Sequence, residues 1–209
     1  MKTIRLREGK ERSLLRGHPW VFQGSVDKGK ADPGETVRVE SATGQFLAWA
    51  SFSPSSMIRV RAWSFDEAER IDADFFAGRI RAAVALRQRL GIASNGVRLI
   101  HGEADGLPGL IVDRYEDILS AQFLSAGTER WKAVIADALL AETASLGCTR
   151  LYERSDSGVR QLEGLEPAKG WLRGEGSTTI TLQEHDIQLT VDVEEGHKTG
   201  YYLDQRENR

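Results

Sequence analysis

The hydrophobic period of this chain changes between residues 65 and 72, and the change divides it into two parts of different secondary structure. Before it, apolar and polar residues alternate in short runs at 3–6, 36–39, 46–52 and 57–63, separated by turns that contain Gly or Pro. A period of two is typical of strands with one buried face. After it, the apolar residues of 71–90 recur at helical spacing, and Gly91 follows as a stop signal. We therefore expect a β-rich domain over residues 1–70, with one short helix at 11–16, followed by a helix that opens a second domain.

The second part combines helices and strands. The patterns predict strands at 97–100, 110–114, 118–123 and 149–153 and a helix at 128–143. Two alternating runs around Gln183-Glu184-His185-Asp186 indicate a hairpin. His185 is expected to be a turn residue, because a catalytic or ligating histidine needs partners placed around it. Residues 71–192 are therefore expected to form a central α/β domain.

The first 30 residues are basic although the whole chain is acidic. They hold eight Lys or Arg residues against three Asp or Glu residues, a net charge of +5, whereas the chain carries −3 and the remainder therefore −8. Cations near phosphates release counterions and attract nucleic acid. The asymmetry fits a polyanion-binding patch as well as it fits an ordinary solvated surface.

Three separated segments carry a family resemblance: RSLLRGHPWVF at residues 12–22, EADGLPGL at 103–110 and HKTGYYLDQR at 197–206. Together they closely resemble the bacterial RlmI family, S-adenosylmethionine (SAM)-dependent 5-methylcytosine methyltransferases of large-subunit ribosomal RNA. The resemblance implies an α+β or mixed fold: a β-rich PUA-like barrel at 1–70, a central α/β domain at 71–192, and a C-terminal Rossmann-like methyltransferase domain. Residues 193–209 would be a linker and the start of that last domain. The family's Glu-Glu-His-Gly-type signature corresponds to Gln183-Glu184-His185-Asp186 here, which departs from it at two of four positions.

The resemblance implies an RNA-binding surface around the first helix of the PUA-like domain, at Lys10, Arg12, Arg16, His18 and Trp20. Arginine and lysine there would hold phosphates, while aromatic side chains would stack on unpaired bases. For Trp20 itself, burial in the core is favoured over a stacking role, because large aromatic side chains usually bury.

A second group of residues lies in the segment that would lead into the methyltransferase domain: Lys198, Thr199, Tyr202, Gln205 and Arg206. By resemblance they would contribute to the wall of a cofactor and substrate cleft. Packing against the methyltransferase domain is an equal alternative, because a shared motif can serve packing as well as chemistry.

Cytosine-C5 methylation needs a glycine-rich turn that holds the cofactor and a cysteine thiolate that attacks the ring. The glycines of 102–110 have the wrong spacing and precede an apolar strand, and Cys148 is expected to be a small buried residue. The charged run Asp204 to Arg209 has no helix stop signal, so we expect the chain to be cut where the catalytic domain begins. We therefore expect an inactive chain with no catalytic residue, no metal site and no tight SAM binding, and loose packing for Lys198 to Arg209.

The remaining expectations concern partners and compartment. The resemblance implies ribosomal RNA as partner and SAM as cofactor of the full-length protein, and it leaves a homodimer open. No run approaches the roughly 20 apolar residues of a membrane span, and the polar start and single cysteine fit a cytoplasmic protein. A free-standing PUA-type RNA-binding or interaction module without enzymatic activity is the alternative to the RNA-recognition part of a methyltransferase.

Overall fold

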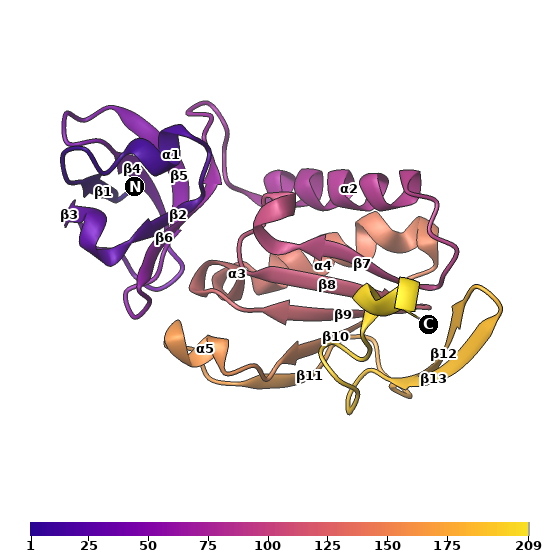
Figure 1. Ribbon diagram of the computed structural model, residues 1–209. Helices are drawn as coiled ribbons and strands as arrows, with labels where there is room; N and C mark the ends of the chain where they lie inside the picture. The colour runs from indigo at the N-terminus through magenta and orange to yellow at the C-terminus, as the bar shows by residue number, and fades with distance from the viewer. Residues whose placement is uncertain (209) are drawn as a thin grey trace.

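The short alternating segments of the first 64 residues form one six-stranded sheet (Figure 1). A computed structural model describes residues 1–208 of the chain, with side chains through Gln205. The strand order is β2-β6-β5-β4-β1-β3, with β1 parallel to β4 and the other neighbours antiparallel. The elements are β1 (Thr3–Leu6), α1 (Arg12–Leu15), β2 (Trp20–Phe22), η1 (Gln23–Ser25), β3 (Val26–Lys28), β4 (Thr36–Glu40), β5 (Phe46–Phe52) and β6 (Ile58–Ser64).

The core of this N-terminal domain follows from the alternation. Ile4 and Leu6 on β1 and Val37 and Val39 on β4 are fully buried and pack in one cluster, while their neighbours along each strand reach the surface. Leu14 anchors α1 on the same cluster. The prediction of a β-rich first domain with one short helix is confirmed.

The second domain begins with α2 (Ala73–Arg89), whose N-terminus is capped by the Asp72 side chain. Its sheet has the order β11-β10-β9-β8-β7, with only β9 and β10 parallel. The further elements are β7 (Gly96–His101), η2 (Gly102–Asp105), β8 (Leu110–Tyr115), β9 (Ile118–Phe123), α3 (Ala126–Arg130), α4 (Lys132–Thr143), η3 (Ala144–Leu146), β10 (Arg150–Ser155), α5 (Val159–Leu162), β11 (Ala168–Arg173), β12 (Thr179–Glu184), β13 (Ile187–Asp192) and η4 (Leu203–Asn208). The single helix expected at 128–143 is interrupted at Trp131, which has a non-helical backbone between α3 and α4.

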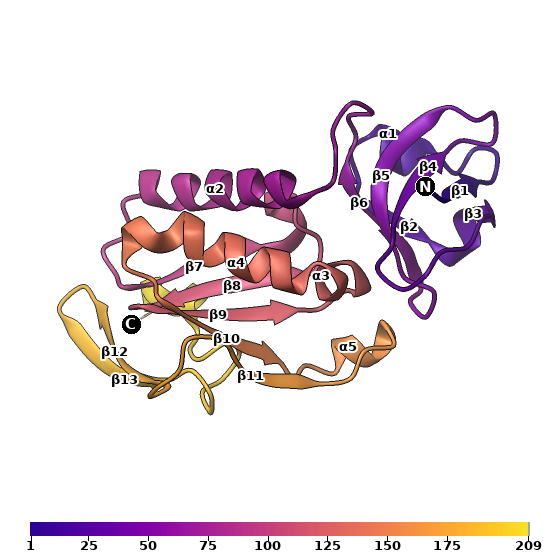
Figure 2. The same cartoon turned by 180° about the vertical axis from the view of Figure 1, so that it is seen from behind.

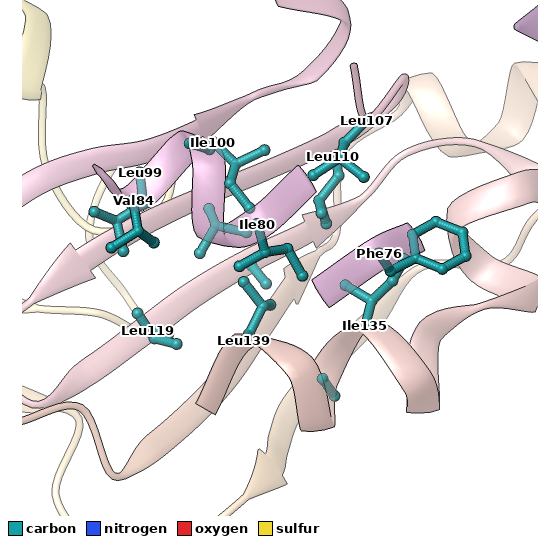
Figure 3. Packing of buried hydrophobic residues seen from close by; sticks show 14 of the residues in the cluster. Phe76, Ile80, Val84, Leu99, Ile100, Leu107, Leu110, Leu119, Ile135 and Leu139 are labelled. Atoms are coloured by element: carbon teal, nitrogen blue, oxygen red, sulfur yellow. The ribbon is translucent and has the colours of Figure 1, made fainter. Parts of the chain in front are cut away.

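Helices α2 and α4 cover one face of the five-stranded sheet (Figures 1 and 2). Phe76, Ile80 and Val84 repeat at four-residue spacing along α2 and are buried against β7, β8, β9 and α4 (Figure 3). The helical stripe predicted for 71–90 is therefore confirmed as the core face as far as Val84, whereas Leu86 and Leu90 at the end of the stripe are exposed. None of the helices in the described part of the chain is long and apolar enough to cross a membrane.

The opposite face of this sheet carries the hairpin β12–β13 and the C-terminal segment. Alternation sends Tyr115, Ile118 and Tyr152 to that face, where they pack with apolar residues of the hairpin and with Val193. The hairpin turn consists of His185 and Asp186, and His185 is exposed with φ of 51°. The prediction of a turn residue at His185 is confirmed.

The two domains meet through small residues. Gly34 of the N-terminal domain lies so close to α3 that an added Cβ would be 2.1 Å from the Ala126 carbonyl oxygen. Across the same boundary, an added Cβ on Gly127 would lie 2.5 Å from Ser51. Helix α3 therefore meets the first domain backbone to backbone at Gly34 and packs Gly127 against the Ser51 side chain, and a larger residue at either glycine would collide.

Candidate nucleic-acid interface

Helix α1 presents a basic face with an apolar centre. Leu14 is buried in the barrel, so Arg12, Leu15 and Arg16, at spacings of three and four residues, share the opposite face. Both arginines are exposed, and Leu15 is 62% exposed. Such a face offers cations to phosphates and an apolar surface to a base or sugar.

The cations around α1 are not neutralised. Elsewhere in this domain, Lys2 forms ion pairs with Asp32 and Glu35, and Arg5 pairs with Glu40. Within the described residues, by contrast, no carboxylate lies within 4.0 Å of the basic groups on or beside α1, which belong to Lys10, Arg12 and Arg16. Their charge is therefore available to a polyanion.

A hollow of about 340 Å³ adjoins this helix. Leu15 and Phe65, the latter 43% exposed, lie at its surface, and its other lining residues are Leu14, Gly17, Phe46 and Leu47. An exposed apolar and aromatic hollow beside unpaired arginines is the combination that unpaired nucleotides require, because bases stack on apolar surfaces while phosphates bind cations. The sequence did not predict a site at either phenylalanine, because Phe46 belongs to an alternating strand-like run and Phe65 lies where the hydrophobic period changes.

Trp20 and His18 lie near this helix, His18 exposed and Trp20 half-buried. The Trp20 indole N–H donates to the Glu103 carboxylate at 2.8 Å, and Glu103 belongs to η2 of the second domain. His18 makes an edge contact with the Trp20 ring at 5.6 Å between centroids. Trp20 is half-buried at the domain boundary, so the expectation that it belongs to the barrel core is wrong; its polar N–H has drawn it to an acidic partner instead.

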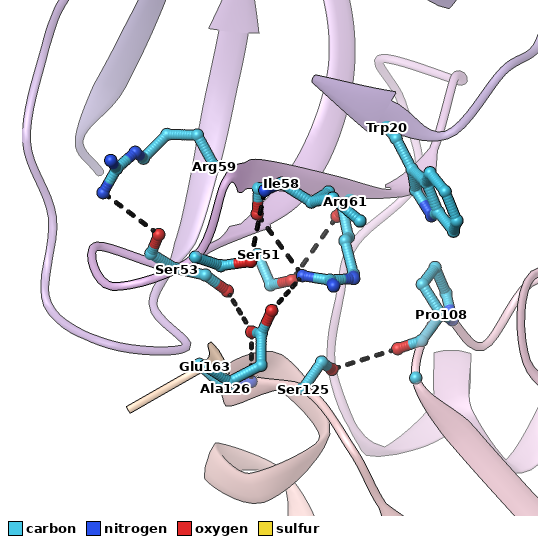
Figure 4. Close-up of polar contacts among 12 residues, drawn as sticks. Trp20, Ser51, Ser53, Ile58, Arg59, Arg61, Pro108, Ser125, Ala126 and Glu163 are labelled. Atoms are coloured by element: carbon cyan, nitrogen blue, oxygen red, sulfur yellow. Dashed lines mark hydrogen bonds and ion pairs between the residues drawn. The ribbon is translucent and has the colours of Figure 1, made fainter. Parts of the chain in front are cut away.

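A buried carboxylate joins the two domains close to Trp20 (Figure 4). Glu163, just after α5, accepts hydrogen bonds from Ser53 Oγ at 2.8 Å and from the Ala126 amide at 3.2 Å. It also forms an ion pair of 2.7 Å with Arg61 of β6, and the two side chains are 1% and 9% exposed. The N-terminal domain is therefore held against the central domain by a buried carboxylate whose partners come from both.

The second group of predicted residues lies on the C-terminal segment, beside a cavity of about 270 Å³. Lys198 and Tyr202 line this cavity together with Arg87 and Arg98. Gln205 is exposed and is not part of the lining, and the side chain of Arg206 lies outside the described residues. The structure therefore brings two of the five residues, Lys198 and Tyr202, to one cavity wall.

Thr199 points the other way and is buried. Its hydroxyl donates to the carboxylate of Asp113 on β8, and it lies 3.1 Å from the hydroxyl of Tyr115. The Tyr115 hydroxyl in turn accepts from the Tyr201 amide at 3.0 Å, while Arg98 holds Asp113 through two bonds of 2.8 and 2.9 Å. Burial raises the pKa of Tyr115 to about 12.

The expectation of loose packing from Lys198 onwards is therefore wrong for the segment from Thr199 to Leu203. Thr199 is 1% exposed, and Tyr201 and Leu203 pack against the cluster around Tyr115. This segment packs on side chains of the central domain, whereas we expected it to pack only on a further domain. Arg209, and the side chains after Gln205, lie outside the described residues.

The prediction that Cys148 is a small buried residue is confirmed. The residue is 4% exposed, and burial raises the pKa of its thiol. A buried thiol with a raised pKa is a poor nucleophile. Among the described residues, moreover, no three His, Cys, Asp or Glu side chains are grouped so that they could hold a metal ion.

Comparison with known proteins identifies relatives of the N-terminal domain and of the whole fold. The sequence profile of a PUA-like domain matches residues 4–65. Two solved structures share the fold of the whole chain. One is of a Streptococcus mutans protein classed as a SAM-dependent methyltransferase (TM-score 0.82, 19% identity, 100% of this chain and 53% of that one). The other is classed as a methyltransferase and was solved with S-adenosylhomocysteine (TM-score 0.82, 18% identity, 100% and 52%).

Curated relatives match in sequence along nearly the whole chain. Proteins named ribosomal RNA large subunit methyltransferase I are 48% identical in Erwinia tasmaniensis and 47% identical in Shewanella denitrificans, each over 99% of this chain and 53% of the relative. The protein of that name from Escherichia coli is 45% identical over 98% of this chain and 52% of its own length. The chain thus spans about half the length of the curated relatives it matches. The resemblance to the RlmI family is confirmed: along 99% of its length this chain is homologous to bacterial ribosomal RNA large subunit methyltransferase I.

Proposed function

We propose that this chain is the RNA-recognition part of a SAM-dependent ribosomal RNA (cytosine-C5) methyltransferase. The observation that carries the proposal is the exposed face of α1, where Arg12 and Arg16 flank the exposed Leu15 and have no carboxylate partner among the described residues. The homologues' names supply the substrate class, and the face supplies the chemistry that recognises it.

The shape of the surface favours unpaired RNA. The hollow beside Leu15 and Phe65 is open to a base that has left a helix, which a duplex with stacked bases cannot offer. Arg12 and Arg16 would hold the phosphates on either side of that base, and Lys10 would add a third contact. We infer that the recognised element is a loop or a bulge of ribosomal RNA.

The described residues do not fit SAM. The glycine-rich turn after β7 leads into strand β8, so it lacks the helix N-terminus whose backbone amides receive a nucleotide. The buried thiol of Cys148 does not fit the nucleophile either. We propose that SAM and the catalytic cysteine are held by parts of the full-length protein beyond these 209 residues, and that this chain alone is inactive. Calorimetric titration of the chain with SAM should give no measurable heat of binding; micromolar affinity would overturn this proposal.

The RNA proposal is tested by charge reversal on α1. Fluorescence anisotropy with a labelled ribosomal RNA hairpin should show strong loss of affinity for the Arg12→Glu/Arg16→Glu variant. The slope of log affinity against log salt should also fall by about 0.7 for each lost phosphate contact with single strands. Unchanged affinity would remove the N-terminal surface from the proposal.

Arg89→Glu is the matched control, because Arg89 is exposed at the end of α2 in the other domain and has no carboxylate partner among the described residues. Arg79 and Arg81 are unsuitable, since they form ion pairs with Glu69 and Glu142. Reversal of either would break a structural contact and confuse the result.

A free-standing RNA-binding or interaction module remains the alternative, and the homologues' names give it no support. A homodimer and a cytoplasmic location remain hypotheses. Sedimentation of the full-length protein at several concentrations would test the first of these.

A further inference from the structure

A groove lined by basic residues lies in the N-terminal domain, separate from the apolar hollow beside α1. Its volume is about 610 Å³, within the roughly 300–1,000 Å³ of small-ligand sites. Arg7, Lys30 and Arg59 line it, together with Gln23 and apolar residues, and its lining includes no Asp or Glu. None of its lining residues belongs to the α1 hollow.

The three cations of this groove keep their charge. The Arg7 guanidinium donates from Nε to the Val26 carbonyl at 3.2 Å, and Arg59 Nη1 donates to the carbonyls of Ser53 and Pro54. Carbonyl acceptors orient a guanidinium without neutralising it, and each of these arginines keeps further N–H donors for a ligand. No carboxylate of the described residues lies within 4.0 Å of the three cations, whereas the neighbouring Arg61 is paired with Glu163.

The floor of the groove is apolar. Phe52 is 4% exposed and forms part of it, with Val26, Ala31 and Pro54. The Arg59 guanidinium lies 5.9 Å from the centre of the Phe52 ring, so aromatic and cationic surfaces adjoin. A basic rim over an apolar floor complements a nucleotide, which joins a phosphate to a flat base.

One turn of the chain connects the groove with α1. Arg7 follows the last residue of β1 and lines the groove, and its carbonyl accepts from the Lys10 amide at 3.1 Å in the turn that leads to α1. The Arg7 amide donates to Ser25 at 3.0 Å, which holds this turn against the groove wall. The segment between the groove and α1 thus carries three exposed cations, Arg7, Lys10 and Arg12, and one exposed carboxylate, Glu8, while Lys30 lines the groove beside Arg7.

We propose that this groove binds an unpaired nucleotide of the RNA strand that crosses α1, with its phosphodiester at Arg7, Lys30 and Arg59. The inference rests on the proposed RNA-recognition function and extends its footprint to a second subsite. The shared ligand chemistry is a phosphate on a nucleotide, so a free nucleotide is the other source that the experiment must separate.

The test compares Lys30→Glu with Lys28→Glu. Lys28 is exposed two residues away on β3, carries the same charge and does not line the groove. Lys30→Glu should weaken binding of a 12-nucleotide single-stranded RNA about fivefold at 0.1 M salt, the loss expected for one phosphate contact, and Lys28→Glu should not. Arg7→Gln should repeat the loss, and circular dichroism should show all three variants folded.

Four outcomes separate the explanations. Loss with Lys30→Glu and Arg7→Gln, on top of the loss caused by the α1 reversal, supports the groove. If the α1 reversal weakens binding and the groove variants do not, the groove proposal fails while the proposed function stands. Wild-type protein that binds no RNA defeats both. Adenosine monophosphate or inorganic phosphate that binds as tightly as the RNA would make the groove a small-anion site and overturn the RNA assignment.

Discussion

Glu163 and Arg61 form an ion pair of 2.7 Å where the two domains meet, and both side chains are almost completely buried. Glu163 also accepts from Ser53 of the N-terminal domain and from the Ala126 amide of the central domain. One carboxylate therefore bonds to groups of both domains. If α1 recognises RNA, this contact helps to fix where the bound strand lies relative to the central domain.

Replacement of Glu163 by Gln should destabilise the chain strongly. The amide cannot neutralise Arg61, and removing one partner of a buried ion pair typically costs about 3–5 kcal/mol. Urea unfolding followed by tryptophan fluorescence would measure the loss. Glu35→Gln, which removes a partner from the exposed Lys2, should change the midpoint little.

An additional variant separates the charge of the pair from its hydrogen bonds. Arg61→Met combined with Glu163→Leu removes both charges and should recover part of the stability lost in Glu163→Gln, because apolar replacements of a buried pair are often neutral. The recovery is partial because Ser53 Oγ and the Ala126 amide lose their acceptor. A double variant no more stable than the single one would contradict this account of the pair.

Thr199→Val tests how the C-terminal segment is held. The substitution keeps the shape but removes the hydroxyl that bonds to Asp113 and lies beside Tyr115, leaving a buried carboxylate with one partner fewer. The expected loss is about 1–3 kcal/mol in unfolding free energy. Limited proteolysis should also cut sooner after residue 197, since the segment is released from the sheet.

Thr190→Val is the control for this substitution, because Thr190 is exposed on β13. It should leave the stability within about 0.5 kcal/mol of wild type. Equal effects of the two substitutions would mean that the Thr199 hydroxyl does not hold the segment.

These two contacts mark what the sequence could not predict. Periodicity identified the helical stripe with Ile80 and Val84, since one face of a helix records its burial in the sequence itself. Glu163 and Thr199 are polar and carry no such record. Glu163 bonds to Ser53, which lies 110 positions away in the sequence, and Thr199 bonds to Asp113, 86 positions away. Because these partners are so distant, no local pattern indicates that either residue is buried.

One part of the candidate site could likewise be predicted from the sequence and the other could not. The cations of α1 could be predicted because they cluster in the sequence, and a family resemblance pointed to them. The groove of Arg7, Lys30 and Arg59 could not, because three separate elements bring these residues together. Short strands such as β2 and β3, of three residues each, likewise show no period of their own.

Alkaline pH should destabilise the protein through Tyr115. Burial raises the pKa of this phenol from 10.0 to about 12, so the folded chain keeps its proton after the unfolded chain has released it. The stability associated with Tyr115 is therefore complete below pH 10 and lost between pH 10 and 12, by about 2–3 kcal/mol.

Urea unfolding at pH 9 and pH 11.5 would measure this loss. Burial also raises the pKa of Tyr152, so the comparison needs Tyr115→Phe, which should be less stable at pH 9 but lose less stability on going to pH 11.5. A Tyr115→Phe variant with the same pH dependence as wild type would assign the effect to other groups.

Gly34→Ala and Gly9→Ala form a matched pair that tests the close approach of the domains. Both glycines have positive φ, 73° and 75°, so the added methyl group strains the backbone similarly, by about 1–2 kcal/mol. The surroundings differ: nothing lies within 4 Å of a Cβ at Gly9, whereas a Cβ at Gly34 would be 2.1 Å from the backbone oxygen of Ala126. Gly34→Ala should therefore lower the unfolding free energy clearly more than Gly9→Ala, and the difference measures the free energy needed to move α3 away from the first domain.

A double variant tests whether the two contacts at this boundary are coupled. Because Arg61 and Glu163 lie at the same boundary, the loss of stability in Gly34→Ala combined with Glu163→Gln should be smaller than the sum of the two separate losses. Equal stability of the two glycine variants would mean that the domains can separate without loss of stability. The inference that the α1 face is held in a fixed position relative to the central domain would then be wrong.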